Sequence, residues 1–184
     1  LRPTCLPGVH WVGPLTDACG QCDRCSEGLE HRCRNGEGIG HGRNGGFAEY
    51  VAVSQFSLVP INTGADLAAS ALFACPMGVA LHGIQTLGQV QPGENVVVTG
   101  AGGGLGVHAV QLSAALGARV LAVTSSPNKA SSLPDFGASD VIDTGQLDFS
   151  EIVLSLTEDE GAQVIIDTVG SALYHSTWRS LAQF

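Results

Sequence analysis

From Gln91 onward, short apolar runs alternate with longer stretches of helical character. Strands buried on both faces are expected to be short, continuous apolar runs. Four segments meet this description: "VVV" (96–98), "RVLAVTSS" (119–126), "SDVID" (139–143) and "QVIIDTVG" (163–170). The stretches between and after them have helical patterns: 104–118, 127–137, 149–161 and 171–184. This alternation predicts right-handed βαβ units on a parallel sheet, an α/β fold of the doubly wound type.

The first part of the chain has a different pattern. Residues 1–63 are expected to be irregular and β-rich. Strands are predicted in "GGFAEYVAV" (45–53), which alternates after a Gly-Gly turn, and in "SLVPI" (57–61), which Pro60 ends. We therefore expect one domain over residues 1–63 and a second over residues 64–184.

The second domain is expected to begin with one or two helices before residue 88. Asp66 is the predicted N-cap and Gly88 the predicted stop, with an interruption near Pro76–Gly78. The segment Leu67–Ile84 carries no formal charge over 18 residues, which is the lower limit for a membrane-spanning helix. Its proline, glycines and histidine favour a helix that packs on a protein core.

Composition and charge exclude several classes of protein. Hydrophobic residues make up 44% and charged residues 14% of the 184, so a sizeable buried core is feasible. The net charge is −9 with only eight Lys and Arg, so no basic surface is expected for nucleic acid or an anionic membrane. The opening "LRPTCLPGVHWVG" lacks the apolar region of a secretory signal. We expect a soluble, cytoplasmic protein that acts on a small-molecule substrate.

Four of the six cysteines lie close together in the stretch "CGQCDRCSEGLEHRC", with spacing C-x2-C-x2-C-x7-C, at Cys19, Cys22, Cys25 and Cys33. Two-residue gaps turn successive thiolates inward, and the longer loop returns a fourth sulfur to complete a tetrahedron. Zn²⁺ suits this geometry, and four sulfurs leave no open position for water, so the site is predicted to be structural. Disulfides, an iron–sulfur cluster and unligated thiols are the alternatives.

The second candidate motif is the glycine-rich stretch "VVVTGAGGGLGVHAVQL", between a predicted strand and a predicted helix. The strict G-x-G-x-x-G pattern does not fit from Gly100, because Leu105 occupies the last glycine position, but G-x-x-G-x-x-G fits. Glycines here let the backbone turn tightly and present helix N-terminal amides to a pyrophosphate. A merely tight turn is the alternative. The predicted dinucleotide-binding residues are Gly100, Gly102, Gly103, Gly104, Leu105 and Gly106.

The end of the next predicted strand bears on the choice of cofactor. NAD-binding proteins of this type place an acidic residue about 20 positions after the glycine loop. Here the stretch is "AVTSSPNK", with no carboxylate before Asp135. Hydroxyls and a cation suit a 2′-phosphate, so NADP(H) is predicted over NAD(H), although Ser125–Pro127 could simply cap a helix. The residues expected to bind it are Thr124, Ser125, Ser126 and Lys129. Asp167 and Thr168, at the end of the fourth strand, are expected to face the cofactor side, and Thr168 is counted among the cofactor-binding residues.

With the four-cysteine loop, "GGFAEYV" and the glycine loop in this order, the chain resembles the medium-chain dehydrogenase/reductase family, zinc-containing alcohol dehydrogenase type. The resemblance implies a partial GroES-like catalytic domain with the structural zinc, followed by an incomplete Rossmann domain. "ALFACPMGVALHG" looks like the segment that supplies the third ligand of the catalytic zinc, so Cys75 is the candidate. The competing interpretation of Cys75 is a small buried hydrophobe.

The resemblance has gaps that affect the expected activity. The family's other catalytic-zinc ligands, a Cys-His pair and a Gly-His-Glu motif, do not occur, and the last strands of the nucleotide domain are lacking. We therefore expect a fragment that does not oxidise alcohols alone. The resemblance implies a zinc-dependent alcohol or carbonyl oxidoreductase, and oligomers of identical chains are usual in that family. An NADPH-dependent enoyl (acrylyl-CoA-like) or quinone reductase, and a nucleotide-binding protein without turnover, are the alternatives.

Overall fold

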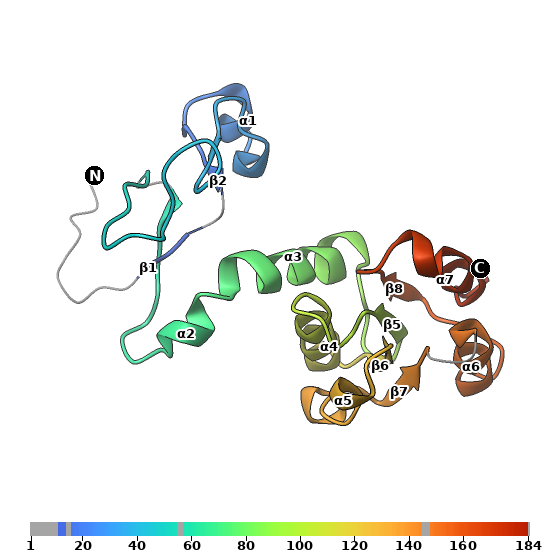
Figure 1. Ribbon diagram of the computed structural model, residues 1–184. Coiled ribbons are helices and arrows are strands. Elements are labelled where there is room, and N and C mark those ends of the chain that lie inside the picture. Colours follow the sequence, from blue (N-terminus) through green and yellow to red (C-terminus); the bar gives the residue numbers. More distant parts are fainter. Residues whose placement is uncertain (1–10, 14–15, 55–56, 145–147, 184) are drawn as a thin grey trace. The chain divides into compact units, whose positions relative to one another are not determined.

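The computed structural model describes residues 11–13, 16–54, 57–144 and 148–183. The chain divides into two compact units, Leu1–Cys75 and Pro76–Phe184, which are treated separately below. The predicted domain boundary after residue 63 lies before this division and stays a prediction. Figure 1 shows the elements of both units.

The first unit has two short antiparallel pairings. Strand β1 (Trp11–Val12) pairs with β4 (Val59–Pro60), and β2 (Thr16–Asp17) pairs with β3 (Glu37–Gly38). The short strand predicted within 57–61 is therefore present and ends at Pro60. The β2–β3 pair encloses the loop with the four cysteines, which contains the single helical turn α1 (Asp23–Ser26).

The strand predicted over residues 45–53 was wrong. The structure has only bends and irregular backbone there, and Phe47 and Tyr50 are fully or largely exposed. A strand is stable only where its backbone groups pair with a neighbouring strand. Among the described residues no strand pairs with this segment, so an alternating sequence alone does not produce one.

The segment from residue 66 to 88 forms a chain of short helices, α2 (Leu67–Ser70), a π-helical turn (Phe73–Met77), α3 (Gly78–Leu81) and a second π-helical stretch (His82–Leu87). The Asp66 carboxylate caps α2 by accepting hydrogen bonds from the N–H groups of Ala68 and Ala69, and Gly88 ends the last stretch, as predicted. Pro76 lies in the π-helical turn, since proline cannot donate to a regular helical ladder. None of the helices in the described parts of the chain is long and apolar enough to cross a membrane.

The second unit is built on a four-stranded parallel sheet in the order β7-β6-β5-β8. Its strands match the four predicted ones: β5 (Asn95–Thr99), β6 (Arg119–Thr124), β7 (Asp140–Asp143) and β8 (Val164–Ile166). The connecting and terminal helices are α4 (Gly106–Ala115), α5 (Pro127–Ala130), α6 (Phe149–Leu156) and α7 (Tyr174–Arg179). This order matches the first four strands of the classic dinucleotide-binding sheet.

The core of this unit lies on both faces of the two central strands. Val96 and Val98 of β5 face α4 on one side, together with Ile84. Val97 of β5 faces α6 on the other side, where Phe149 is fully covered. Figure 1 shows α4 and α6 on opposite sides of the sheet. Successive side chains of a strand point to opposite faces, so a strand covered on both faces needs an apolar run. The loops that follow the carboxyl ends of β5, β6 and β8 therefore begin at well-packed strands.

We expect Asp148→Ala to lower the free energy of unfolding by about 1 kcal/mol at pH 7, because the side chain caps α6 and accepts from Ser150 N at 3.0 Å. Hydrogen bonds from the Ser176 hydroxyl and Ser150 N–H hold the pKa of Asp148 below its ordinary value. Its contribution is therefore complete above about pH 4 and is lost as the pH falls through the folded-state pKa.

Urea titrations at pH 7 and at pH 3 measure this difference between wild type and variant. Glu151→Gln is the matched control, since its side chain is exposed and lies 3.9 Å from Arg179. We expect this control to change stability by less than about 0.5 kcal/mol. A cost of Asp148→Ala that does not shrink at pH 3 would contradict the role assigned to the carboxylate charge.

Candidate functional site: a cysteine knuckle and a glycine loop

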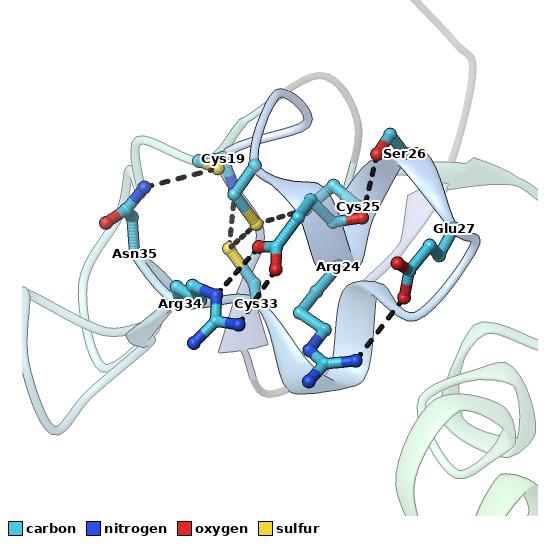
Figure 2. A network of polar contacts seen from close by, with 10 residues as sticks. Cys19, Arg24, Cys25, Ser26, Glu27, Cys33, Arg34 and Asn35 are labelled. Atoms are coloured by element: carbon cyan, nitrogen blue, oxygen red, sulfur yellow. Dashed lines mark hydrogen bonds and ion pairs between the residues drawn. The ribbon is translucent and has the colours of Figure 1, made fainter.

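The four predicted cysteines converge on one point in the first unit. The loop that carries them, residues 19–33, is called the cysteine knuckle below. The sulfur atoms of Cys19, Cys22, Cys25 and Cys33 all lie within 4.8 Å of one another, with Cys22 Sγ 3.5 Å from Cys25 Sγ and 3.9 Å from Cys33 Sγ. Figure 2 shows the sulfurs turned toward a common centre. A tetrahedral Zn²⁺ with Zn–S of about 2.3 Å places its sulfurs about 3.8 Å apart. These separations fit a structural zinc, and no fifth ligand is needed.

The loop itself prepares part of this cluster for metal binding. The backbone N–H of Gln21 holds the pKa of Cys19 at about 6, and the N–H of Arg34 lowers the pKa of Cys22. Burial and the neighbouring thiols raise the pKa of Cys25 to about 12. Thiolates are the form that binds metal, so a cation would have to displace the proton of Cys25.

Ion pairs hold the knuckle in place around the sulfurs. Arg34 contacts Asp23 with two parallel hydrogen bonds of 2.7 and 2.8 Å, and Arg24 lies 3.3 Å from Glu27 (Figure 2). The Asn35 amide is 3.8 Å from the sulfur of Cys19. These groups are exposed, so they orient the loop more than they stabilise it.

Sequence reasoning missed a second anchor directly before the knuckle. Asp17, in β2, is buried and pairs with Arg43. Its carboxylate also accepts hydrogen bonds from Ser54 N at 2.9 Å and from the Ser57 hydroxyl at 2.5 Å. A buried carboxylate two residues before Cys19 is thereby satisfied and fixes the start of the cysteine loop.

The glycine loop of the second unit has the geometry expected of a dinucleotide-binding turn. Gly100 has φ of +60°, and Gly103 N donates to Gly100 O at 2.8 Å. A side chain on Gly106 would collide with the Gly100 carbonyl, so the helix α4 can begin this close to the strand only with glycine. Val107 N, in the first turn of α4, donates to Gly103 O at 3.0 Å, and the other amides at a helix N-terminus are the groups that bind a phosphate in such a turn.

The predicted 2′-phosphate residues lie at the end of β6, next to this loop. Thr124 is buried, and its hydroxyl accepts from Ser126 N at 3.2 Å, whereas Ser125 is exposed. Ser126 is the N-cap residue of α5 but makes no side-chain cap. The side chain of Lys129 covers Gly102, with its Cβ and Cδ each 2.9 Å from the point where a Cβ of Gly102 would lie. The structure thus places the aliphatic part of the Lys129 side chain against the glycine loop.

A third group of residues lies at the end of β8, on the other side of β5. The Thr168 hydroxyl donates to Thr99 O at 2.8 Å and faces Gly100. Thr99 is fully buried and donates to Asp167 Oδ1 at 2.6 Å. Thr99 was not predicted as a site residue, and its only sequence signal is a hydroxyl at the end of an apolar run.

Cys75, the predicted catalytic ligand, is exposed in the π-helical turn Phe73–Met77. It is therefore not a small buried hydrophobe in this structure. Within the described residues, the only group of three or more clustered metal-binding side chains is the four-cysteine knuckle, so Cys75 has no co-ligands there. Its role as a zinc ligand stays a prediction.

A four-sulfur lobe joined to a parallel dinucleotide-binding sheet defines a class, the zinc-type nucleotide-dependent dehydrogenases. Two family models match the chain, the alcohol dehydrogenase GroES-like domain over residues 8–63 and the zinc-binding dehydrogenase domain over residues 104–183. The chain belongs to the zinc-type medium-chain dehydrogenase/reductase family. The predicted fold class, GroES-like followed by Rossmann-type α/β, is confirmed with it.

Individual relatives differ in their reactions. The chain is 34% identical over 162 residues to an acryloyl-coenzyme A reductase of Sulfurisphaera tokodaii, covering 88% of this chain and 47% of the relative. It is 32% identical over 155 residues to an L-threonine 3-dehydrogenase of Rhizobium rhizogenes, covering 84% and 44%. A crystal structure of an NAD-dependent alcohol dehydrogenase superposes with a TM-score of 0.90 at 28% identity, covering 96% of this chain and 52% of the other. The chain spans about half the length of the curated relatives it matches.

We expect the purified chain to retain one zinc ion at the knuckle and Cys25→Ser to lose it, because the remaining three sulfurs leave the tetrahedron open. Elemental analysis after dialysis against a chelator measures the zinc content of each protein. Cys75→Ser is the matched control and should keep this zinc. Equal zinc in wild type and Cys25→Ser would show that the metal lies elsewhere.

Proposed function

We propose that this protein is an NADP(H)-preferring, zinc-dependent oxidoreductase that transfers hydride between the cofactor and a small alcohol, aldehyde or ketone. The observation that carries the cofactor preference is the position of Lys129, whose side chain lies over Gly102 at the edge where the phosphates are expected. An ammonium group and the exposed hydroxyl of Ser125 provide donors for a 2′-phosphate. No carboxylate lies between the end of β6 and Asp135 to accept the ribose hydroxyls of NAD.

Different residues of this chain would bind the parts of the cofactor and the zinc ions. The backbone of Gly100–Gly106 would hold the pyrophosphate, and Ser125 and Lys129 the 2′-phosphate. The zinc of the four-cysteine knuckle would fix its lobe without touching the substrate, because all four positions are sulfur. Cys75 would act as a thiolate ligand of a second zinc, which when bound supplies a Lewis acid for a carbonyl or alkoxide oxygen.

A second candidate is an NADPH-dependent enoyl reductase that adds hydride to an activated double bond. Relatives named acryloyl-coenzyme A reductase support it, with 34 and 33% identity over 88 and 95% of this chain. NADPH consumption with a short aldehyde and with acryloyl-CoA distinguishes the two, when it is measured on a protein that also includes the half of the relatives' length that this chain does not cover. Aldehyde reduction that is lost on zinc chelation supports the first candidate, and acryloyl-CoA reduction that survives chelation supports the second.

We expect Lys129→Ala to weaken NADPH binding by roughly tenfold and to leave NADH binding within about twofold of wild type. The tenfold loss corresponds to one charge-assisted contact with the 2′-phosphate, which NADH lacks. Dissociation constants from the fluorescence of the two reduced cofactors measure both effects.

Asn128→Ala is the matched control, because Asn128 is the exposed neighbour of Lys129 on α5. It should bind both cofactors as wild type does. Tighter binding of NADH than of NADPH by wild type would reject the proposed cofactor preference. A parallel loss of both cofactors in Lys129→Ala would instead indicate a contact with the pyrophosphate.

A further inference from the structure

One oxygen of Asp167 collects three hydrogen bonds just after β8. Its Oδ1 accepts from the Thr99 hydroxyl at 2.6 Å, from Val169 N at 2.9 Å and from Gly170 N at 3.0 Å. Two of these donors belong to the loop that Asp167 itself begins, and the third belongs to β5. The carboxylate therefore fixes the conformation of the loop and ties it to the neighbouring strand.

Thr168 completes the link between the β8 loop and the glycine loop. Its backbone N–H donates to Thr99 Oγ1 at 3.1 Å, and its hydroxyl donates to the Thr99 carbonyl at 2.8 Å. Thr99, the last residue of β5, is followed directly by Gly100, and a Cβ on that glycine would lie 2.5 Å from Thr168 Oγ1 and 3.1 Å from Val169 Cγ2. The β8 loop is thus in direct contact with the first glycine of the phosphate loop.

The topology indicates which half of a dinucleotide would lie there. Strands β6 and β8 flank β5 on opposite sides. Lys129 and Ser125 follow β6, so a cofactor with its 2′-phosphate at these residues and its pyrophosphate on the glycine loop extends past β5 toward β8. The nicotinamide half then lies over the loop that Asp167 organises.

We propose that Asp167 is a positioning residue for the nicotinamide half of the cofactor, acting through Oδ1 on the loop 168–170. The inference rests on the proposed function, because it takes NADP(H) as the ligand. A carboxylate next to a polyanionic cofactor is electrostatically unfavourable, so its value here is geometric. Burial raises the pKa of Asp167, but hydrogen bonds from Gly170 N–H, the Thr99 hydroxyl and Val169 N–H outweigh burial and lower it.

The experiment compares two ligands on the complete chain, NADPH and adenosine 2′,5′-bisphosphate, which has the 2′-phosphate but no nicotinamide half. In Asp167→Ala we expect NADPH to bind about tenfold more weakly, the factor that one hydrogen bond's net contribution supplies. The bisphosphate should bind within about twofold of wild type, because it lacks the nicotinamide half that the loop 168–170 would position. A general loss of structure would weaken both ligands equally.

Two further variants separate geometry from charge. Asp167→Asn retains an acceptor oxygen for the three donors, so NADPH should bind within about threefold of wild type. Thr99→Val removes the hydroxyl that joins Asp167 to Thr168 and should weaken NADPH as Asp167→Ala does, also without affecting the bisphosphate. Asp135→Asn is the charge control, since Asp135 is exposed beyond α5 and should leave both affinities unchanged.

Three results would overturn the inference: unchanged NADPH affinity in Asp167→Ala, equal loss of both ligands in Asp167→Ala and Thr99→Val, or Asp167→Asn as weak as Asp167→Ala. If Asp167→Ala fails to fold, Thr99→Val decides between the first two. Failure of the proposed function gives a different result, because wild type itself would then bind neither ligand.

Discussion

The complete burial of β5 on both faces is the constraint on which the candidate cofactor site depends. Val96, Val97 and Val98 have no exposed surface, since one face packs on α4 and the other on α6. The strand is therefore held in register with both neighbours, and its carboxyl end cannot shift. Thr99 ends this strand and Gly100 follows it, so the phosphate loop begins at a position that the packed strand fixes. The loop after β8 is tied to the same position by the hydrogen bonds of Thr99 with Asp167 and Thr168. The packing of three valines thus fixes the place where the cofactor would lie.

The cysteine knuckle is not held together by apolar packing, because it has almost no apolar core of its own. Cys25 is the only buried residue of α1, and polar side chains surround the sulfurs. Small lobes of this kind depend on a metal for their folding free energy. The β2–β3 pair and the buried Asp17 hold both ends of the loop, and the four sulfurs lie within 4.8 Å of one another between them. Each unit therefore places its ligands with a different kind of interaction.

The sequence predicted those features that depend on residues close together in the chain. The four strands of the second unit are apolar runs, the glycine loop follows the first of them, and the cysteines lie within fifteen residues, so all were found in the sequence. The strand predicted over 45–53 was wrong because its stability depends on a partner outside the segment. The Asp17–Arg43 and Thr99–Asp167 pairs join residues 26 and 68 positions apart, and no spacing rule connects them. Only the fold brings these groups together.

The contact between Lys129 and Gly102 has a consequence for how cofactor preference can change in this family member. The aliphatic part of the Lys129 side chain occupies the space that a Cβ of residue 102 would need, so this residue can only be glycine while the lysine is in place. Replacing the lysine with a short acidic residue would leave that space empty, whereas enlarging the glycine would push the lysine away. On the proposed NADP(H) preference, redesigning the chain toward NAD(H) would call for paired exchanges at both positions, and natural divergence at one should be accompanied by divergence at the other.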